Sequence, residues 1–142
     1  MATWQYTLKI IPEDFRGDTE LAWEGREVFE DAIKELAKVF PMADSWDEHL
    51  EIYGDLQSTC VEVWREDGRV TQISTRLDLR NISEETAGDI VRFAQSINGV
   101  FEEVDGKIVK PEMKDMNKGI LASDAYQFVQ NSNKFLDSKR IG

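Results

Sequence analysis

Residues 60–79, CVEVWREDGRVTQISTRLDL, decide the fold because they contain two alternating runs joined by a tight turn. The turn is Asp67-Gly68, a favoured two-residue hairpin connection, and it separates a run at 60–65 from a run at 70–79. One predicted side of the second run carries Thr71, Ile73, Thr75, Leu77 and Leu79. Polar and charged residues fall on the other side. This alternation predicts an antiparallel sheet with one covered face and one more polar face.

Upstream of this hairpin, the sequence predicts a strand, a loop and a helix. Residues 4–10 alternate aromatic or aliphatic residues with polar ones, which is typical of a half-buried strand. Residues 12–25 are expected to form an acidic loop anchored by Leu21 and Trp23. The period then changes, and residues 26–40 predict an amphipathic helix. Its apolar side consists of Val28, Phe29, Ala32, Ile33, Leu36, Val39 and Phe40.

Residues 41–57 are consistent with two different structures. The alternation from Trp46 to Tyr53 suits a short strand, whereas Trp46, Leu50 and Tyr53 also share one side of a helix. Gly54 ends either element. The sequence leaves open whether this segment adds a strand to the sheet.

Downstream of the hairpin, we expect a second helix and a second hairpin. The helix runs from a cap at Asn81 or Ser83 to a stop at Asn98-Gly99. Residues 100–110 then form a hairpin through Asp105-Gly106, which is the best hairpin turn in the chain.

The end of the chain is predicted to be helical. One helix begins at Pro111, a final helical piece covers 123–131, and Phe135 and Leu136 hold the tail. The complete order predicts an α+β fold in a single domain, residues 1–142. Its antiparallel sheet has ferredoxin-like β-α-β-β-α-β order, with helices packed on one face, plus an extra C-terminal strand and C-terminal helices.

The chain is acidic, with a formal net charge of −11 over 142 residues. Residues 1–106 hold 10 Lys and Arg against 24 Asp and Glu, whereas residues 107–142 hold 7 against 4. An acidic body repels phosphate backbones, so we expect no binding to nucleic acid. The sequence contains no apolar stretch of about 18 residues and no signal-peptide pattern. We therefore expect a cytoplasmic protein that does not associate with membranes.

The residue types needed for catalysis or metal binding are scarce. His49 is the sole histidine and Cys60 the sole cysteine, which excludes His₂-carboxylate and Cys₄ metal sites within one chain. The sequence contains no Gly-x-Ser-x-Gly, Ser-x-x-Lys or Gly-x-Gly, so it lacks nucleophile elbows and Gly-rich phosphate loops. The acidic residues of 44–55 lack the spacing of an EF-hand and are interpreted as a solvated segment. The sequence predicts no catalytic residue, no cofactor and no metal.

One candidate recognition patch lies on the polar face of the predicted sheet. If the alternation holds, Trp64, Arg76, Asp78 and Arg80 share that face. Trp and Arg are among the residues that most often contribute binding energy at interfaces. The alternative is that the C-terminal helices or the 12–25 loop cover Trp64, while the arginines neutralise acidic neighbours.

A second candidate patch lies in the acidic segment. It consists of Trp46 and Tyr53, with carboxylates on either side in the sequence. An exposed tryptophan among carboxylates suits a partner surface that is basic and partly apolar.

Segments in the C-terminal half carry a resemblance to known proteins. They are RLDLRN at 76–81, the Asp-Gly hairpin ending in Lys110-Pro111, SDAYQFV at 123–129 and NKFL at 133–136. With these segments, the chain resembles a group of small uncharacterised bacterial proteins, and this resemblance implies no reaction and no site residues. In size, acidity and lack of catalytic groups, the chain is also similar to the immunity proteins that neutralise bacterial toxins.

Three functions follow as hypotheses. The first is a non-enzymatic binding module that docks a basic protein partner, in the manner of an immunity protein. The second is a small-molecule-binding protein or enzyme with a pocket between sheet and helices, using His49, Tyr53, Arg76 and Asp78. The third is a structural subunit that forms a homodimer through its sheet face. The sequence alone leaves monomer and homodimer open.

Overall fold

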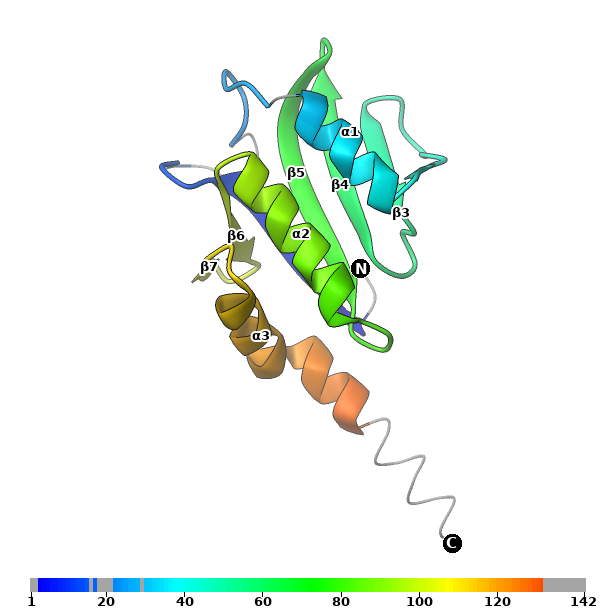
Figure 1. The fold of residues 1–142 in the computed structure, drawn as a ribbon, viewed down its shortest axis with the longest axis vertical. Coiled ribbons are helices and arrows are strands. Elements are labelled where there is room, and N and C mark those ends of the chain that lie inside the picture. Colours follow the sequence, from blue (N-terminus) through cyan, green and yellow to red (C-terminus); the bar gives the residue numbers. More distant parts are fainter. Residues whose placement is uncertain (1–2, 16, 18–21, 29, 132–142) are drawn as a thin grey trace, which may run out of the picture.

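The computed structural model describes residues 3–15, 17, 22–28 and 30–131 of the chain (Figure 1). In this part of the chain the fold is mixed α+β. The strands are β1 (Gln5–Pro12), β2 (Met42–Ala43), β3 (Leu50–Gly54), β4 (Cys60–Glu66), β5 (Arg69–Asp78), β6 (Gly99–Glu103) and β7 (Ile108–Val109). The helices are α1 (Glu30–Val39), α2 (Glu84–Ser96), α3 (Met113–Ala122) and a last helical segment at 124–131.

One sheet contains all seven strands, in the order β2-β3-β4-β5-β1-β6-β7, and every pairing is antiparallel. The first strand of the chain therefore lies inside the sheet, where Leu8 is opposite Thr75 of β5 and Glu103 of β6. The predicted α+β class and antiparallel sheet are confirmed. The sheet is larger than the predicted one, because β2 and β3 extend it beyond β4.

The helices lie on one face of the sheet. α1 and α2 run side by side across this face, and α3 packs beside α2 near β7 (Figure 1). The predicted apolar side of β5 points toward the helices, and Ile73, Thr75 and Leu77 are at most 1% exposed. The helices contribute the buried side chains of Ile33, Leu36, Ala87, Ile90, Val91, Phe93 and Ala94. Across the described residues, no helix is long and apolar enough to cross a membrane.

The first helix differs from its prediction at both ends. α1 begins at Glu30, later than the predicted start of the helix at 26–40, and Val28 is buried ahead of it. Val39 was predicted to lie in the core, but its side chain is 49% exposed. The reason is that Val39 lies on the side of α1 that borders a cleft between α1 and α2. The predicted core or anchor residues Leu21, Phe29, Phe135 and Leu136 lie outside the described residues.

Local turn and cap chemistry explains where several elements end. Asp67 and Gly68 have φ angles of 51° and 78°, the left-handed values that a type I′ hairpin turn needs. Of the two predicted caps, Ser83 begins α2, since its Oγ accepts a hydrogen bond from the Thr86 amide at 3.1 Å. Asn98 follows α2 with a φ of 54°, as predicted for a left-handed stop.

Residues 41–57 form strands and loops. β3 pairs with β4, which places Leu50 opposite Trp64 and Tyr53 opposite Val61. Because successive residues of a strand point to opposite faces, Ile52 points away from the helices and Tyr53 toward them. The strand interpretation of this segment is therefore correct, and the helical spacing of Trp46, Leu50 and Tyr53 was misleading.

Trp23, which was predicted to anchor the segment after β1, is buried and hydrogen-bonded. Trp23 is 3% exposed, and its indole N–H donates a hydrogen bond to the carbonyl of Ile10 at 2.7 Å. Its backbone amide donates to the carbonyl of Thr71. These bonds attach Trp23 to both β1 and β5.

Candidate functional site

The face of the sheet opposite the helices is named the open face here, because no described helix covers it. Its side chains alternate with those of the core along each strand, and Arg76, for example, lies opposite Thr7 and Cys60. Two loops, at 44–49 and 55–59, lie against part of this face. The second is held by Gln5, whose amide nitrogen donates to the carbonyls of Leu56 and Ser58 at 3.1 and 2.6 Å.

Trp64 lies on this open face beside a small apolar cluster. The cluster consists of Leu50, Ile52 and Cys60, each at most 3% exposed, with Leu56 and Trp64 packed against it. The indole of Trp64 packs against this cluster and is half-buried. The expectation that Trp64 shares the polar face is therefore met by its position. The described C-terminal helices lie on the opposite face and do not cover it.

Trp46 lies edge-on against Trp64. The ring centroids are 5.6 Å apart with an interplanar angle of 72°, a favourable geometry for an aromatic pair. Trp46 is 69% exposed even though it makes this contact. The two candidate patches, which were predicted as separate sites, are therefore in contact through Trp46 and Trp64.

The loop that carries Trp46 is held by its own hydrogen bonds. The Ser45 hydroxyl donates to the Asp47 carbonyl at 2.9 Å and accepts from the Asp47 amide at 3.2 Å. The Asp47 carboxylate accepts from the His49 amide at 2.8 Å. Because these bonds define the turn on both sides of Trp46, the loop presents the indole from a fixed backbone.

Carboxylates surround Trp46 along the loop. Asp44 and Glu48 are exposed and Asp47 is half-buried. The His49 ring lies 3.4 Å from Glu48, and its side chain is 57% exposed. We name Trp46, Trp64, Asp44, Asp47 and Glu48 the tryptophan patch. It combines an exposed aromatic ring with three carboxylates.

Arg76 is neutralised by a neighbour on the open face. Its Nε lies 2.8 Å from Oε1 of Glu62, whose side chain is 7% exposed. The Nε–H bond of Arg76 does not point at the carboxylate closely enough to form a hydrogen bond, so the contact is an ion pair. Arg76 therefore follows the alternative stated above, in which an arginine neutralises an acidic neighbour, here Glu62.

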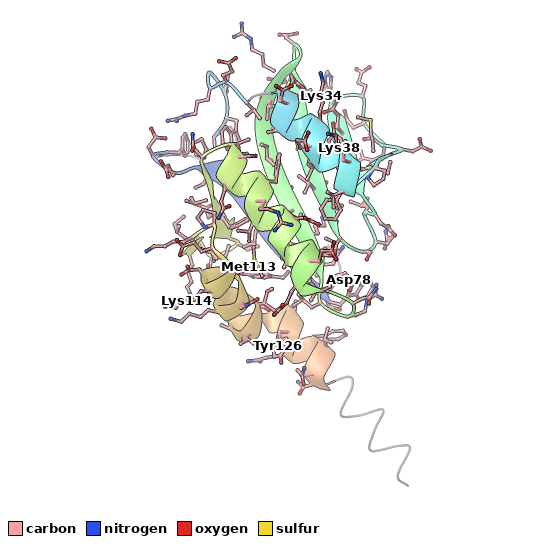
Figure 2. The ribbon with its side chains drawn as sticks, viewed as in Figure 1. Lys34, Lys38, Asp78, Met113, Lys114 and Tyr126 are labelled. Carbon is pink, nitrogen blue, oxygen red and sulfur yellow. The ribbon has the colours of Figure 1, made fainter. Side chains whose placement is uncertain are left out.

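Asp78 and Arg80 form a second ion pair at the end of β5, where Figure 2 labels Asp78. The buried carboxylate of Asp78 accepts from Nε and Nη2 of Arg80 at 3.0 and 2.9 Å, and from the Ser58 hydroxyl at 3.0 Å. The guanidinium carbon of Arg80 lies 4.0 Å from the centre of the Trp4 ring. Asp78 therefore ties the 55–59 loop to β5 and orients Arg80. Neither side chain belongs to the tryptophan patch.

The hydrogen bonds from Arg80, followed by those from the Arg80 amide and Ser58, hold the pKa of Asp78 below its usual value. An unfolded aspartate titrates at a pKa of about 3.9. The carboxylate therefore stabilises the fold above that pH, and this stability is lost as the pH falls through the lower pKa of the folded state.

We expect Asp78→Asn to lower stability at neutral pH by about 1–3 kcal/mol and to flatten the acid side of the stability curve. Arg80→Gln should flatten it too, because it removes the donor that lowers the Asp78 pKa. Urea unfolding followed across acidic pH measures both effects. Parallel curves for wild type and both variants would show that this pair does not govern the acid response.

Tyr53 belongs to the core and does not line the tryptophan patch. It is 3% exposed on the helix-covered face, and its hydroxyl donates to Glu51 at 3.0 Å. Burial, followed by the Glu51 charge, raises the pKa of Tyr53 to about 12. Glu51 also accepts from Arg65, which reaches Glu30 of α1 at 2.8 Å. This network ties β3 and β4 to α1.

The residues suggested for a small-molecule pocket do not converge. His49 is exposed on a loop, Tyr53 is in the helix-side core, and Arg76 and Asp78 are in separate ion pairs on the open face. Burial raises the pKa of the Cys60 thiol to about 12, so it is protonated at neutral pH. Within the described residues, no group of three or more His, Cys, Asp or Glu is placed to hold a metal ion.

Comparison with protein-family models, curated proteins and solved structures found no match to this chain. Sequence reasoning missed Glu62 as the partner of Arg76. It also missed the contact between Trp46 and Trp64, for which the sequence carries no local signal.

Proposed function

We propose that this protein is a non-enzymatic binding module that docks a basic protein partner through the tryptophan patch. One observation carries the proposal: Trp46 is 69% exposed while its ring rests edge-on against Trp64. A large aromatic ring held in water from a fixed loop is a pre-organised anchor, since little side-chain freedom is lost when a partner covers it.

The carboxylates around Trp46 support a basic partner. Asp44, Asp47 and Glu48 attract lysine and arginine side chains, and the same side chains bind favourably over the face of an indole. The chain's net charge of −11 adds a long-range attraction, which speeds the encounter with a basic protein. The patch therefore offers both a steering field and an apolar anchor.

The same features support an inhibitor or immunity-protein-like role in the cytoplasm. Such a protein needs to occupy the surface of a toxin or enzyme without carrying out chemistry itself. The separation of His49, Tyr53, Arg76 and Asp78 argues against a shared pocket for these four groups and so favours this reading over the small-molecule alternative.

A monomer is favoured over a dimer built by joining sheet edges. The edge strands β2 and β7 contain two residues each. Short edge strands offer few backbone groups for pairing with a second sheet. A dimer through the open face remains the alternative that light scattering tests.

We also propose that β4, β5, β1 and β6, with α1 and α2, are a ferredoxin-like core. These four strands are adjacent in that order, and the helices precede β4 and β6 along the chain. On this view, β2 and β3 are an insertion after α1. The insertion carries Trp46, so the elaboration of the fold also supplies the binding site.

The test is affinity capture from the native host with tagged full-length protein at low and high salt, identified by mass spectrometry. We expect one stoichiometric basic protein at low salt that is released at high salt, because ions screen exposed charges. A complex that is indifferent to salt, or a captured partner that is acidic, would contradict electrostatic docking.

A further inference from the structure

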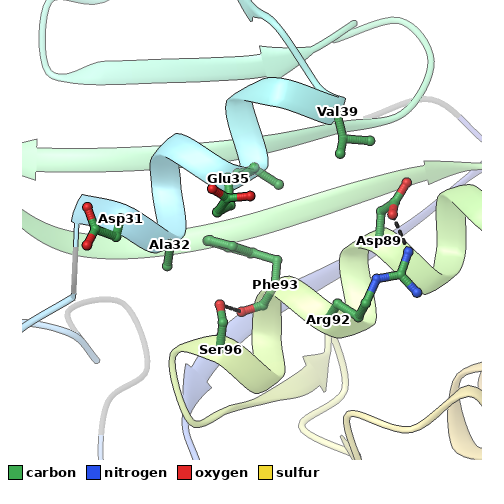
Figure 3. Close-up of a pocket in the computed structure, with 9 residues that line it drawn as sticks. Asp31, Ala32, Glu35, Val39, Asp89, Arg92, Phe93 and Ser96 are labelled. Carbon is green, nitrogen blue, oxygen red and sulfur yellow. Dashed lines mark hydrogen bonds and ion pairs between the residues drawn. The ribbon is translucent and has the colours of Figure 1, made fainter.

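A cleft of about 550 Å³ lies between α1 and α2, on the face opposite the tryptophan patch (Figure 3). Its base is apolar, formed by Leu36 and Phe93, which are 4% and 5% exposed. Ala32 and Val39 extend the apolar surface along α1, and Val39 is 49% exposed at the edge. The volume falls within the range of about 300–1,000 Å³ that ligand-binding clefts show.

The borders of the cleft are mainly acidic. On the α1 side, Asp31 and Glu35 are one turn apart and both line the cleft (Figure 3). On the α2 side, Asp89 forms an ion pair with Arg92, which is the one cation among the described lining residues. The cleft therefore carries three carboxylates and one guanidinium.

The lysines of α1 only partly balance these carboxylates. Lys38 pairs with Glu35 at 2.7 Å, but the two side chains are 69% and 70% exposed, so water screens the pair. Lys34 lies one turn away from Lys38 along the outer surface of α1 (Figure 2). An apolar base bordered by net negative charge remains.

We propose that this cleft binds the apolar side of a short basic amphipathic helix supplied by a protein partner. A helix that lies along two others can insert apolar side chains at i, i+3 and i+4 between them. Lysine or arginine on its flanks then faces Asp31, Glu35 and Asp89. The site goes beyond the tryptophan patch, and because the two lie on opposite faces of the sheet, both can be occupied at once.

The probe is a fluorescein-labelled peptide with leucine at i, i+3, i+4 and i+7 and lysine elsewhere. A matched peptide keeps the leucines and has glutamate in place of lysine. Fluorescence anisotropy with the full-length protein is expected to show saturable binding of the lysine peptide, weaker by about tenfold or more for the glutamate peptide. Equal binding of both peptides would overturn the role of the acidic borders.

Two doubly substituted proteins with the same change in charge locate the peptide. Asp31→Lys/Glu35→Lys is expected to weaken binding by about tenfold, whereas Asp44→Lys/Glu48→Lys in the tryptophan patch should leave it within about twofold. Val39→Asn, a neutral polar change at an exposed position, should weaken binding without lowering the melting temperature. The opposite ranking of the two double variants would overturn the proposal, because the peptide would then occupy the tryptophan patch.

Sedimentation velocity without peptide tests whether a second copy of the chain occupies the cleft instead. We expect wild type and Val39→Asn to sediment as the same species. A wild-type dimer that Val39→Asn converts to monomer would overturn the proposal, since a second copy of the chain would then occupy the cleft.

Discussion

Replacing Trp46 with alanine is expected to weaken binding of the basic partner by about 2 kcal/mol, or roughly 30-fold, because the variant removes the central anchor of the patch. Stability should change little, since the ring is 69% exposed and contributes mainly its edge contact with Trp64. Isothermal titration calorimetry with the captured partner measures the affinity, and thermal unfolding measures the stability.

Val104→Ala is the matched control for this loss of apolar surface. Val104 is 82% exposed and follows β6, on the far side of the sheet order from β3. It should leave the affinity within about twofold, as expected for a residue outside the energetic centre of an interface. If Trp46→Ala binds as tightly as wild type, Trp46 is not the anchor.

Gly54→Ala is expected to destabilise the fold by about 2–4 kcal/mol, the largest effect on stability that we predict. Gly54 has a φ of 103°, a conformation that side chains rarely adopt, and an added Cβ would lie 2.5 Å from the carbonyl oxygen of Thr59. That oxygen accepts the Asp55 amide at 3.1 Å where the chain leaves β3. The methyl group must therefore displace backbone that closes the β3–β4 connection.

Gly68→Ala separates the effect of space from the effect of φ. Gly68 has a φ of 78°, but nothing lies within 4 Å of an added Cβ. We expect a cost of about 1 kcal/mol from the left-handed conformation alone. Urea unfolding followed by tryptophan fluorescence compares the two variants. Equal losses of stability would show that the close approach to Thr59 does not matter.

Much of the secondary structure was predictable because its signals are local. Alternation identified β1, β4 and β5, and the Asp67-Gly68 pair identified the turn between the last two. The N-cap of α2 and the left-handed residue that follows the helix were similarly visible as Ser83 and Asn98. In each case the residues that decide the structure lie within a few positions of one another.

The size of the sheet was not predictable, because strand pairing depends on residues far apart in the sequence. Residues 41–57 satisfied both a helical and an alternating pattern. This segment forms a strand because Leu50–Gly54 pairs with β4, and local spacing does not encode that pairing. The same pairing places the side chain of Tyr53 on the helix-covered face, away from Trp46.

The candidate site was predictable in its residue types and not in its assembly. Trp46 and Trp64 were each singled out, but they belong to different elements and meet only because β3 lies beside β4. The sequence places Asp78 and Arg80 on one face, where they form an ion pair, whereas Glu62 as the partner of Arg76 required the positions of both side chains. The sequence therefore indicates which residues could belong to the patch, whereas the contact between its two tryptophans depends on the pairing of β3 with β4.

The most direct test of the central claim is a side-by-side capture from one host lysate with wild type, Trp46→Ala and Val104→Ala as baits at low salt. Quantitative mass spectrometry then compares the partner recovered on each. The proposed site predicts the same basic protein on wild type and Val104→Ala, with strong depletion on Trp46→Ala. Equal recovery on all three baits, or depletion on Val104→Ala alone, would contradict docking through the tryptophan patch.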